Sequence, residues 1–154
     1  MSNSLSDRCS ERVTVRKVKV EENGKKAVFL NPEGVEYIRT KIDGCLIQGQ
    51  TACDWMVHCD SHGGVLIELK GKDVDRALEQ LAASFDFVVN SGDRPIALAG
   101  LIVCSGMPKH PGFDTKLQRA RQRFFRAYRA PVHIVTGNHE YRLPSVLSFK
   151  GPFC

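Results

Sequence analysis

The sequence predicts an α/β fold in which a mixed β-sheet has a helix on each side. Two observations lead to this prediction. Short apolar runs typical of buried strands recur along the chain, and after residue 64 they alternate with two segments of helical periodicity. Strands that alternate with helices are typical of a sheet covered by helices. The length of 154 residues fits one compact domain. We expect a disordered polar tail over residues 1–11, the domain over 12–142 and a loose C-terminal tail over 143–154.

A β-hairpin is expected first. Residues 12–22 alternate β-branched with charged side chains, Asn23-Gly24 suits a tight turn, and an apolar-rich segment follows as the returning strand. Residues 35–48 are ambiguous between a short helix and a strand. We interpret residues 42–47 within that segment as extended.

The rest of the domain is predicted to alternate strands and helices. Apolar stripes with a period near 3.6 mark the helices, and a nearly continuous apolar run marks a central buried strand. In order, the expected elements are strands at 52–58 and 64–70, a helix at 72–85, a strand at 95–104, a helix at 115–129 and a strand at 132–136.

Charge and cysteine content narrow the class of protein. The net charge of +5 mildly favours a polyanionic partner. The six cysteines include no Cys-x-x-Cys pair, so zinc spacing is absent. No apolar run approaches membrane-spanning length, and the first residues lack the apolar core of an export signal. We therefore expect a cytoplasmic protein with reduced thiols and no membrane partner, in which Cys53 and Cys104 are small core residues.

Two neighbouring predicted strands carry charges where buried strands normally have none. Asp54 lies in the run Cys-Asp-Trp-Met-Val, and Glu68 and Lys70 lie in Val-Leu-Ile-Glu-Leu-Lys-Gly. Side chains two residues apart in a strand share a face, so Glu68 and Lys70 point to the same side. Burying such charges is costly unless they are paired or bind a metal. Two alternatives follow: a solvent-facing ion pair on an edge strand, or an active site.

An active site built from these residues would suit a divalent metal beside a phosphodiester. Mg²⁺ prefers one or two carboxylates together with water and phosphate oxygens. Adjacent strands lie roughly 5 Å apart, so Asp54 and Glu68 can meet across them. The Leu69 carbonyl could add a further ligand, and Lys70 would orient a water or neutralise charge that develops on the phosphate.

The block that contains these residues, with the helix pattern Asp-Val-Asp-Arg-Ala-Leu-Glu-Gln-Leu that follows it, resembles the core of the PD-(D/E)xK nuclease superfamily. The resemblance spans roughly residues 40–105 and implies a restriction-endonuclease-like αβββαβ core. It implies that Asp54 is the metal-binding aspartate, Glu68 the second acidic ligand and Lys70 the lysine of the motif. One departure is that Cys53, rather than proline, precedes Asp54.

The same resemblance implies further site residues at less regular positions. The family often places a polar residue in the following helix, where Gln80 is the candidate; the alternative is a solvated helix face. It often adds an acidic residue from an early helix, and Glu33, Glu36 and Asp43 compete for that role. We include Glu36 and Asp43 among the candidate metal ligands, although Asp43, beside Gly44, equally suits a turn.

The second predicted helix, residues 115–129, has a basic face. Its cations on one side are Lys116, Arg119, Arg123 and Arg126. The side chains on the apolar side are Leu117, Ala120, Phe124, Phe125 and Tyr128. Like charges repel at i,i+4 spacing, so a polyanion would relieve a cost. We interpret the basic face as a contact for nucleic-acid phosphates; the alternative is pairing with acids elsewhere in the fold.

These features together predict a nuclease that uses Mg²⁺ or Mn²⁺ and acts on DNA. A homodimer is a further expectation by resemblance, because small nucleases of this fold often cut both strands as dimers. Two alternatives stay open. One is an inactive nuclease-fold protein that binds nucleic acid or a protein partner, and the other is a protein-interaction domain whose arginines are paired internally.

Overall fold

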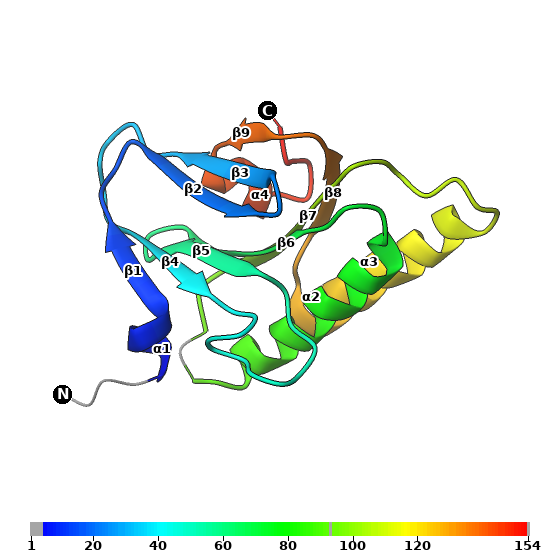
Figure 1. Cartoon of the computed structure of the whole chain (residues 1–154), viewed down its shortest axis with the longest axis horizontal. Helices are drawn as coiled ribbons and strands as arrows, with labels where there is room; N and C mark the ends of the chain where they lie inside the picture. Colours follow the sequence, from blue (N-terminus) through cyan, green and yellow to red (C-terminus); the bar gives the residue numbers. More distant parts are fainter. Residues whose placement is uncertain (1–4, 93, 154) are drawn as a thin grey trace.

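A computed structural model describes residues 5–92 and 94–153 of the chain (Figure 1). In chain order the elements are α1 (Leu5–Cys9), β1 (Ser10–Val13), β2 (Lys17–Glu22), β3 (Lys25–Leu30), β4 (Tyr37–Lys41), β5 (Trp55–Cys59), β6 (Gly63–Leu69), α2 (Val74–Val89), β7 (Leu98–Cys104), α3 (Phe113–Tyr128), β8 (Val132–Thr136), β9 (His139–Tyr141) and α4 (Leu143–Leu147). The predicted hairpin is confirmed as β2 and β3, which pair antiparallel across Asn23-Gly24.

A mixed six-stranded sheet in the order β1-β4-β5-β6-β7-β8 forms the centre of the molecule. Strands β1, β4, β5 and β6 pair antiparallel in turn, whereas β6, β7 and β8 are parallel. Every residue of β6 and β7 is buried. This burial explains why both strands read as nearly continuous apolar runs in the sequence, and it makes a charged residue within β6 exceptional.

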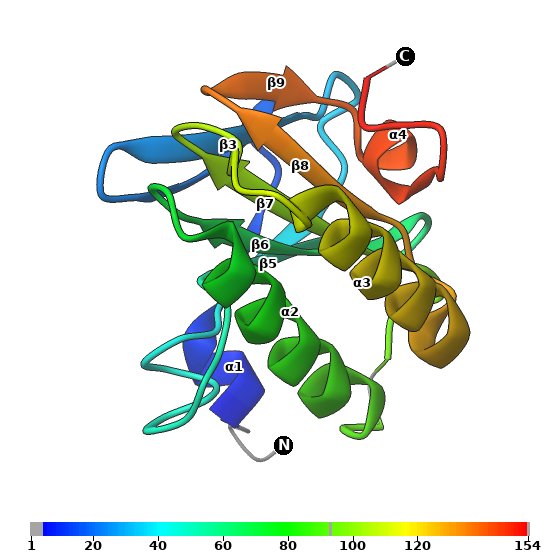
Figure 2. The same ribbon diagram turned by 90° about the vertical axis from the view of Figure 1, so that its right-hand side faces the viewer.

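Both long helices cover the same face of this sheet, and a small sheet covers the other (Figure 2). The small sheet has the order β2-β3-β9, and α4 lies on its side of the central sheet. The expectation of one long helix on each side is therefore wrong. The crossovers through α2 and α3 step in the same direction, from β6 to β7 and from β7 to β8. Because such crossovers are right-handed, both helices reach one face.

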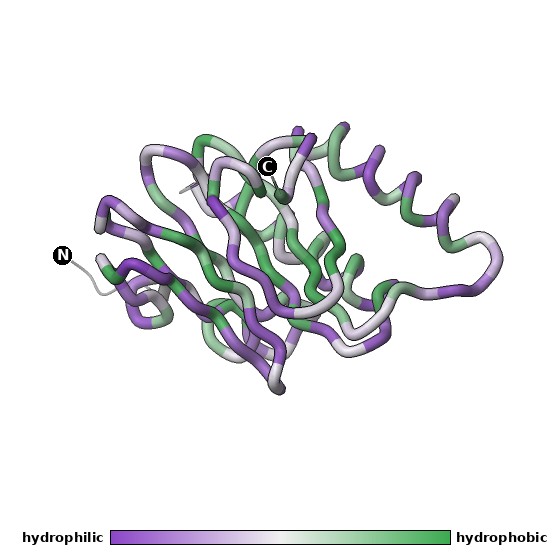
Figure 3. Tube along the Cα trace, turned by 90° about the horizontal axis from the view of Figure 1, so that it is seen from above, coloured by the Kyte–Doolittle hydropathy of each residue, from purple (hydrophilic) through white to green (hydrophobic). Residues whose placement is uncertain are grey.

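Two hydrophobic cores result, one on each face of the central sheet. Leu66, Leu81, Phe85 and Phe124 belong to the core beneath α2 and α3. The core on the other face joins β6 and β7 to the small sheet and α4. In Figure 3 hydrophobic colour follows the central strands, while hydrophilic colour recurs along α3. The two faces of β6 thus differ: its odd-numbered side chains point to the small sheet and its even-numbered ones to the helices.

Three predictions about irregular segments are wrong. Residues 5–11, expected within a disordered tail, form α1 and the first half of β1, and β1 pairs with β4; residues 1–4 lie outside the described residues. Residues 42–47, expected to be extended, form turns after β4. The C-terminal tail instead begins with α4, whose Leu143 and Val146 are fully buried. In each segment tertiary contacts, rather than local periodicity, order the backbone.

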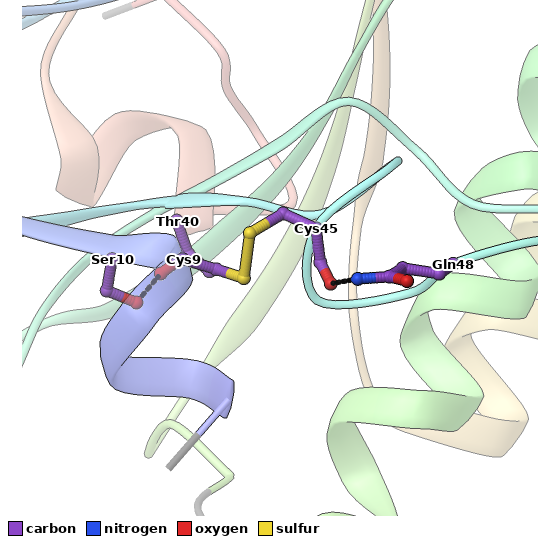
Figure 4. The surroundings of a disulfide bond; sticks show 5 residues. All are labelled: Cys9, Ser10, Thr40, Cys45 and Gln48. Atoms are coloured by element: carbon purple, nitrogen blue, oxygen red, sulfur yellow. Dashed lines mark hydrogen bonds between the residues drawn. A yellow bond between two sulfur atoms is a disulfide. The ribbon is translucent and has the colours of Figure 1, made fainter. Parts of the chain in front are cut away.

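A disulfide joins Cys9 at the end of α1 to Cys45 in the turns after β4 (Figure 4). Beside it, Ser10 and Thr40 share a hydrogen bond of 2.8 Å between their hydroxyl oxygens. The expectation that every cysteine is reduced is therefore wrong for this pair. Cys53 and Cys104 are confirmed as buried free thiols. Among the described residues, no helix has the length and apolar character needed to cross a bilayer.

Candidate active site

Strand pairing places Asp54 directly opposite Glu68. In the antiparallel register of β5 and β6, Trp55 is paired with Ile67. Asp54 and Glu68 are the next residues of the two segments and therefore lie opposite each other. Two hydrogen bonds fix Asp54 against β6. The Asp54 N–H donates to the Ile67 carbonyl over 3.1 Å, and the Leu69 N–H donates to Asp54 Oδ2 over 2.8 Å. The predicted meeting of the two carboxylates is confirmed.

Glu68 is buried although its side chain is a carboxylic acid. Its side chain points to the helix-covered face, the residue is only 2% exposed, and its Oε1 has no hydrogen-bond partner among the described residues. Lys70 makes no ion pair with any described carboxylate. Strand β6 also lies between β5 and β7 rather than at an edge. The alternative of a solvent-facing ion pair on an edge strand is therefore wrong.

The environment raises the pKa of both acids. Burial is the main cause of the rise in the pKa of Glu68 to about 8, the nearby Asp54 carboxyl adds to it, and the Lys70 ammonium opposes it. Burial likewise raises the pKa of Asp54, against the Leu69 N–H hydrogen bond and the Lys41 charge, which lower it. Two acids that lie together away from water favour a shared proton or a bound cation.

A cavity of about 390 Å³ opens beside this pair. The residues that line it are Asn23, Lys25, Asp43, Asp54, Glu68, Leu69, Lys70, Gly71 and Gln80. Six of the sequence-derived candidates, Asp43, Asp54, Glu68, Leu69, Lys70 and Gln80, thus share one cavity. Glu36 does not join them: it lies before β4, at the end of that strand away from Asp54, and forms an exposed ion pair of 2.6 Å with Arg12.

Gln80 is held toward the site rather than on a solvated helix face. Its Nε2 donates to the Ala52 carbonyl over 3.2 Å, and its Oε1 is buried without a partner among the described residues. Helix α2, which carries it, begins at an N-cap where Asp73 accepts from the Arg76 N–H. Buried oxygens of Gln80 and Glu68 that lack partners face a polar cavity.

The N-terminal hairpin adds residues to the site that no motif in the sequence indicates. Asn23 in its turn and Lys25 at the start of β3 line the cavity. Lys41, at the end of β4, pairs with Glu22 and lies 4.9 Å from the centre of the Trp55 ring. No sequence pattern links Asn23 and Lys25 to Asp54, because only the packing of the small sheet over the central one brings them close, whereas Lys41 comes close through the pairing of β4 with β5.

The donor set fits a hard divalent cation. Asp54 and Glu68 offer carboxylate oxygens, one of them without a partner, and the Leu69 backbone borders the same cavity. Among residues 5–92 and 94–153 there is no group of three or more His, Cys, Asp or Glu side chains placed to share a metal. Two carboxylates suffice for Mg²⁺ where water and phosphate oxygens complete the coordination.

The basic helix is α3, and all four of its predicted cations are exposed. No described carboxylate forms an ion pair with Arg119, Arg123 or Arg126, whereas Lys116 lies 3.4 Å from Asp75. The alternative of internal pairing therefore applies to Lys116 alone. Phe125 is also misplaced by the helical wheel: it is 46% exposed and lies outside the core that Leu117, Phe124 and Tyr128 join.

No family model, curated protein or solved structure matches this chain.

Proposed function

We propose that the chain is a metal-dependent nuclease that hydrolyses phosphodiester bonds, with DNA as its substrate. The observation that carries this proposal is the pair of the half-buried Asp54 and the buried Glu68, in which Glu68 Oε1 has no partner among the described residues and faces a polar cavity that Lys70 also lines. Structural acids in a core are normally paired or hydrogen-bonded. A buried carboxylate oxygen without a hydrogen-bond partner, next to a second acid, is better explained by a site that binds a cation and a substrate.

The arrangement of elements supports the same proposal. Strands β4, β5 and β6 form an antiparallel meander, α2 follows, and β7 returns parallel to β6. This succession corresponds to the last five elements of the αβββαβ core that the PD-(D/E)xK resemblance implies, whereas the element before β4 is β3 rather than a helix. We take Asp54 and Glu68 as the acids of that motif. The resemblance and the site geometry are separate observations, because the resemblance concerns residue pattern and the geometry concerns burial and hydrogen bonding.

In this mechanism Asp54 and Glu68 would hold the metal, with the Leu69 carbonyl as a further ligand. Mg²⁺ or Mn²⁺, when bound, supplies charge that polarises the scissile phosphate and lowers the pKa of a water. The Lys70 ammonium stabilises the negative charge that develops on the phosphate oxygens. Gln80 Oε1 accepts a hydrogen bond from a water and orients it, while Gln80 Nε2 donates to the Ala52 carbonyl.

A cleavage assay with Mg²⁺ tests the proposal. We expect Glu68→Gln and Lys70→Ala each to reduce the rate of DNA cleavage by about 10² or more. Lys72→Ala is the matched control, because Lys72 is exposed and does not line the cavity, and it should retain the rate within about twofold. Cleavage by Glu68→Gln at the wild-type rate would contradict the proposal.

An inactive nuclease-fold protein that binds nucleic acid is the second candidate. The observation that favours it is that Asp43, although it lines the same cavity, does not form with Asp54 and Glu68 a group of three side chains placed to share a metal among the described residues. Calorimetric titration with Mn²⁺ separates the two. The nuclease proposal expects binding that Asp54→Asn abolishes, whereas DNA binding without any Mn²⁺ binding would support the inactive protein.

A further inference from the structure

A second cavity, of about 900 Å³, lies at the C-terminal half of α3. The residues that line it are Gln118, Arg121, Gln122, Phe125, Arg126, Arg129, Ala130, Pro131, Val132, His133, Phe149 and Gly151. None of them lines the cavity beside Asp54 and Glu68. The two cavities differ in chemistry as well, because the lining of this one includes arginines and aromatic rings but no carboxylate.

Two exposed aromatic rings form one wall. Phe125 comes from α3 and Phe149 from the segment after α4; they are 46% and 57% exposed. Their ring centres lie 5.6 Å apart at an interplanar angle of 71°. Leaving two such rings in water is unfavourable, and a planar ligand that stacks on Phe149 would cover apolar area.

Three arginines surround these rings. The Arg129 guanidinium lies 4.9 Å from the centre of the Phe125 ring, and Arg121 Nε donates to the Val132 carbonyl over 3.2 Å. Arg126 has no ion-pair partner among the described residues and also belongs to the outer basic face of α3. The cavity is therefore continuous with the surface already proposed to contact phosphates, and its charge selects an anion.

We propose that this cavity binds an unpaired segment of nucleic acid, with a base stacked on Phe149 and the neighbouring phosphate held by Arg126. Stacking on an aromatic side chain requires a free base face, which a duplex hides inside its stack. Proteins bind single strands through arginine next to an exposed ring, because the arginine contacts the phosphate and the ring stacks on the base.

The position of this cavity also constrains the substrate, an inference that rests on the proposed nuclease function. Helix α3 has 16 residues, so its ends lie about 24 Å apart. The start of α3 lies beside the start of α2, because Lys116 is 3.4 Å from Asp75 in the first turn of α2. Lys70 and Gly71, which line the first cavity, come just before α2 in the chain. The aromatic cavity lies toward the other end. The substrate would thus carry unpaired nucleotides several positions from the bond that is cut.

Fluorescence anisotropy tests this proposal with a labelled oligodeoxythymidylate and a labelled duplex of equal length, in EDTA so that no strand is cut. We expect Phe149→Ala to weaken single-strand binding about tenfold and duplex binding less than about twofold. Phe149→Trp, which keeps a stacking surface, should bind the single strand at least as tightly as wild type.

Phe153→Ala is the matched control. Phe153 is also exposed, at 51%, but stacks on Tyr141 at 5.5 Å and does not line the cavity. Unchanged single-strand binding by Phe149→Ala, an equal loss of duplex binding, or no binding of either probe by wild type would overturn the proposal. A protein that shows the expected single-strand loss but cuts no DNA with Mg²⁺ would overturn the nuclease function and leave this site intact.

Discussion

Glu68 places a titratable group in the hydrophobic layer beneath α2. Its neighbours in the strand, Ile67 and Leu69, are buried in the core on the other face, and Asp54 stands opposite it. Such a carboxyl is stable in that place only when it is protonated or faces a cation. The residue therefore couples the stability of the metal-free protein to pH.

We expect the metal-free protein to lose stability between pH 5 and pH 8. The pKa of Glu68 is about 8 in the folded chain against 4.5 ordinarily, so within this window the folded state retains a proton that the unfolded state releases. The free energy of unfolding falls as pH rises through a window of that kind. Glu68→Gln cannot lose a proton and should be more stable than wild type by roughly 2–4 kcal/mol at pH 8.

Urea unfolding in EDTA at several pH values measures this difference. The gain should shrink below about 1 kcal/mol at pH 5, because this pH is only slightly above the ordinary pKa of 4.5 at which the unfolded state of wild type releases the proton. Glu79→Gln, on the exposed face of α2, is the control and should follow wild type at each pH. An equal gain at pH 5 and pH 8 would mean that the effect comes from packing rather than from the charge.

Helix α3 divides its surface among three tasks. Leu117, Phe124 and Tyr128 pack into the core, Arg119 and Arg123 project from the outer face, and Phe125 turns toward the second cavity. A two-sided helical wheel assigns Phe125 to the core because the residue is apolar. The narrow contact with the sheet leaves its ring uncovered, so an aromatic ring and the free cations share the exposed surface.

Charge reversal on the outer face of α3 should weaken duplex binding and reduce its dependence on salt. If Arg119 and Arg123 each neutralise one phosphate, Arg119→Glu with Arg123→Glu should lower the slope of log K against log salt by about 1.8. The control pair Arg16→Glu with Lys19→Glu makes the same change of charge on exposed residues away from α3. Equal slopes for the two double variants would show that only net charge matters.

At the scale of the whole molecule, the disulfide ties the N-terminal segment to the segment that carries Asp43. Cys9 belongs to α1, and Cys45 lies two residues after Asp43, which lines the first cavity. The bond spans 36 positions of sequence. Closing a loop of this length restricts the unfolded chain and so favours the folded one.

Cys9→Ser with Cys45→Ser should lower the free energy of unfolding by about 3–4 kcal/mol. Urea denaturation of the oxidised wild type and of the variant gives the difference directly. Dithiothreitol should lower the stability of wild type to that of the variant and leave the variant unchanged. A wild type that is equally stable with and without the reductant would show that the bond does not restrict the unfolded chain.

Local pattern was enough to predict the hairpin, the central apolar strands, both long helices and the meeting of Asp54 with Glu68. Period-2 alternation and continuous apolar runs report burial residue by residue, and antiparallel pairing of two adjacent runs restricts the register. The same logic could not place Glu36, because its distance from Asp54 depends on which end of β4 it occupies. Nor could it find Lys25, whose hairpin reaches the site only through the packing of two sheets.

The sequence by itself determined most of the buried positions of the strands and the long helices, because burial on one face produces a periodic pattern of apolar residues. The tertiary structure alone decided that both long helices share one face, that α4 is ordered, that Cys9 bonds to Cys45 and that Phe125 stands beside Phe149. These outcomes depend on contacts between segments far apart in the chain, whose pairing leaves no local trace. The candidate acids could be found from the sequence pattern, whereas the cavities that would receive a substrate are formed only by the tertiary structure.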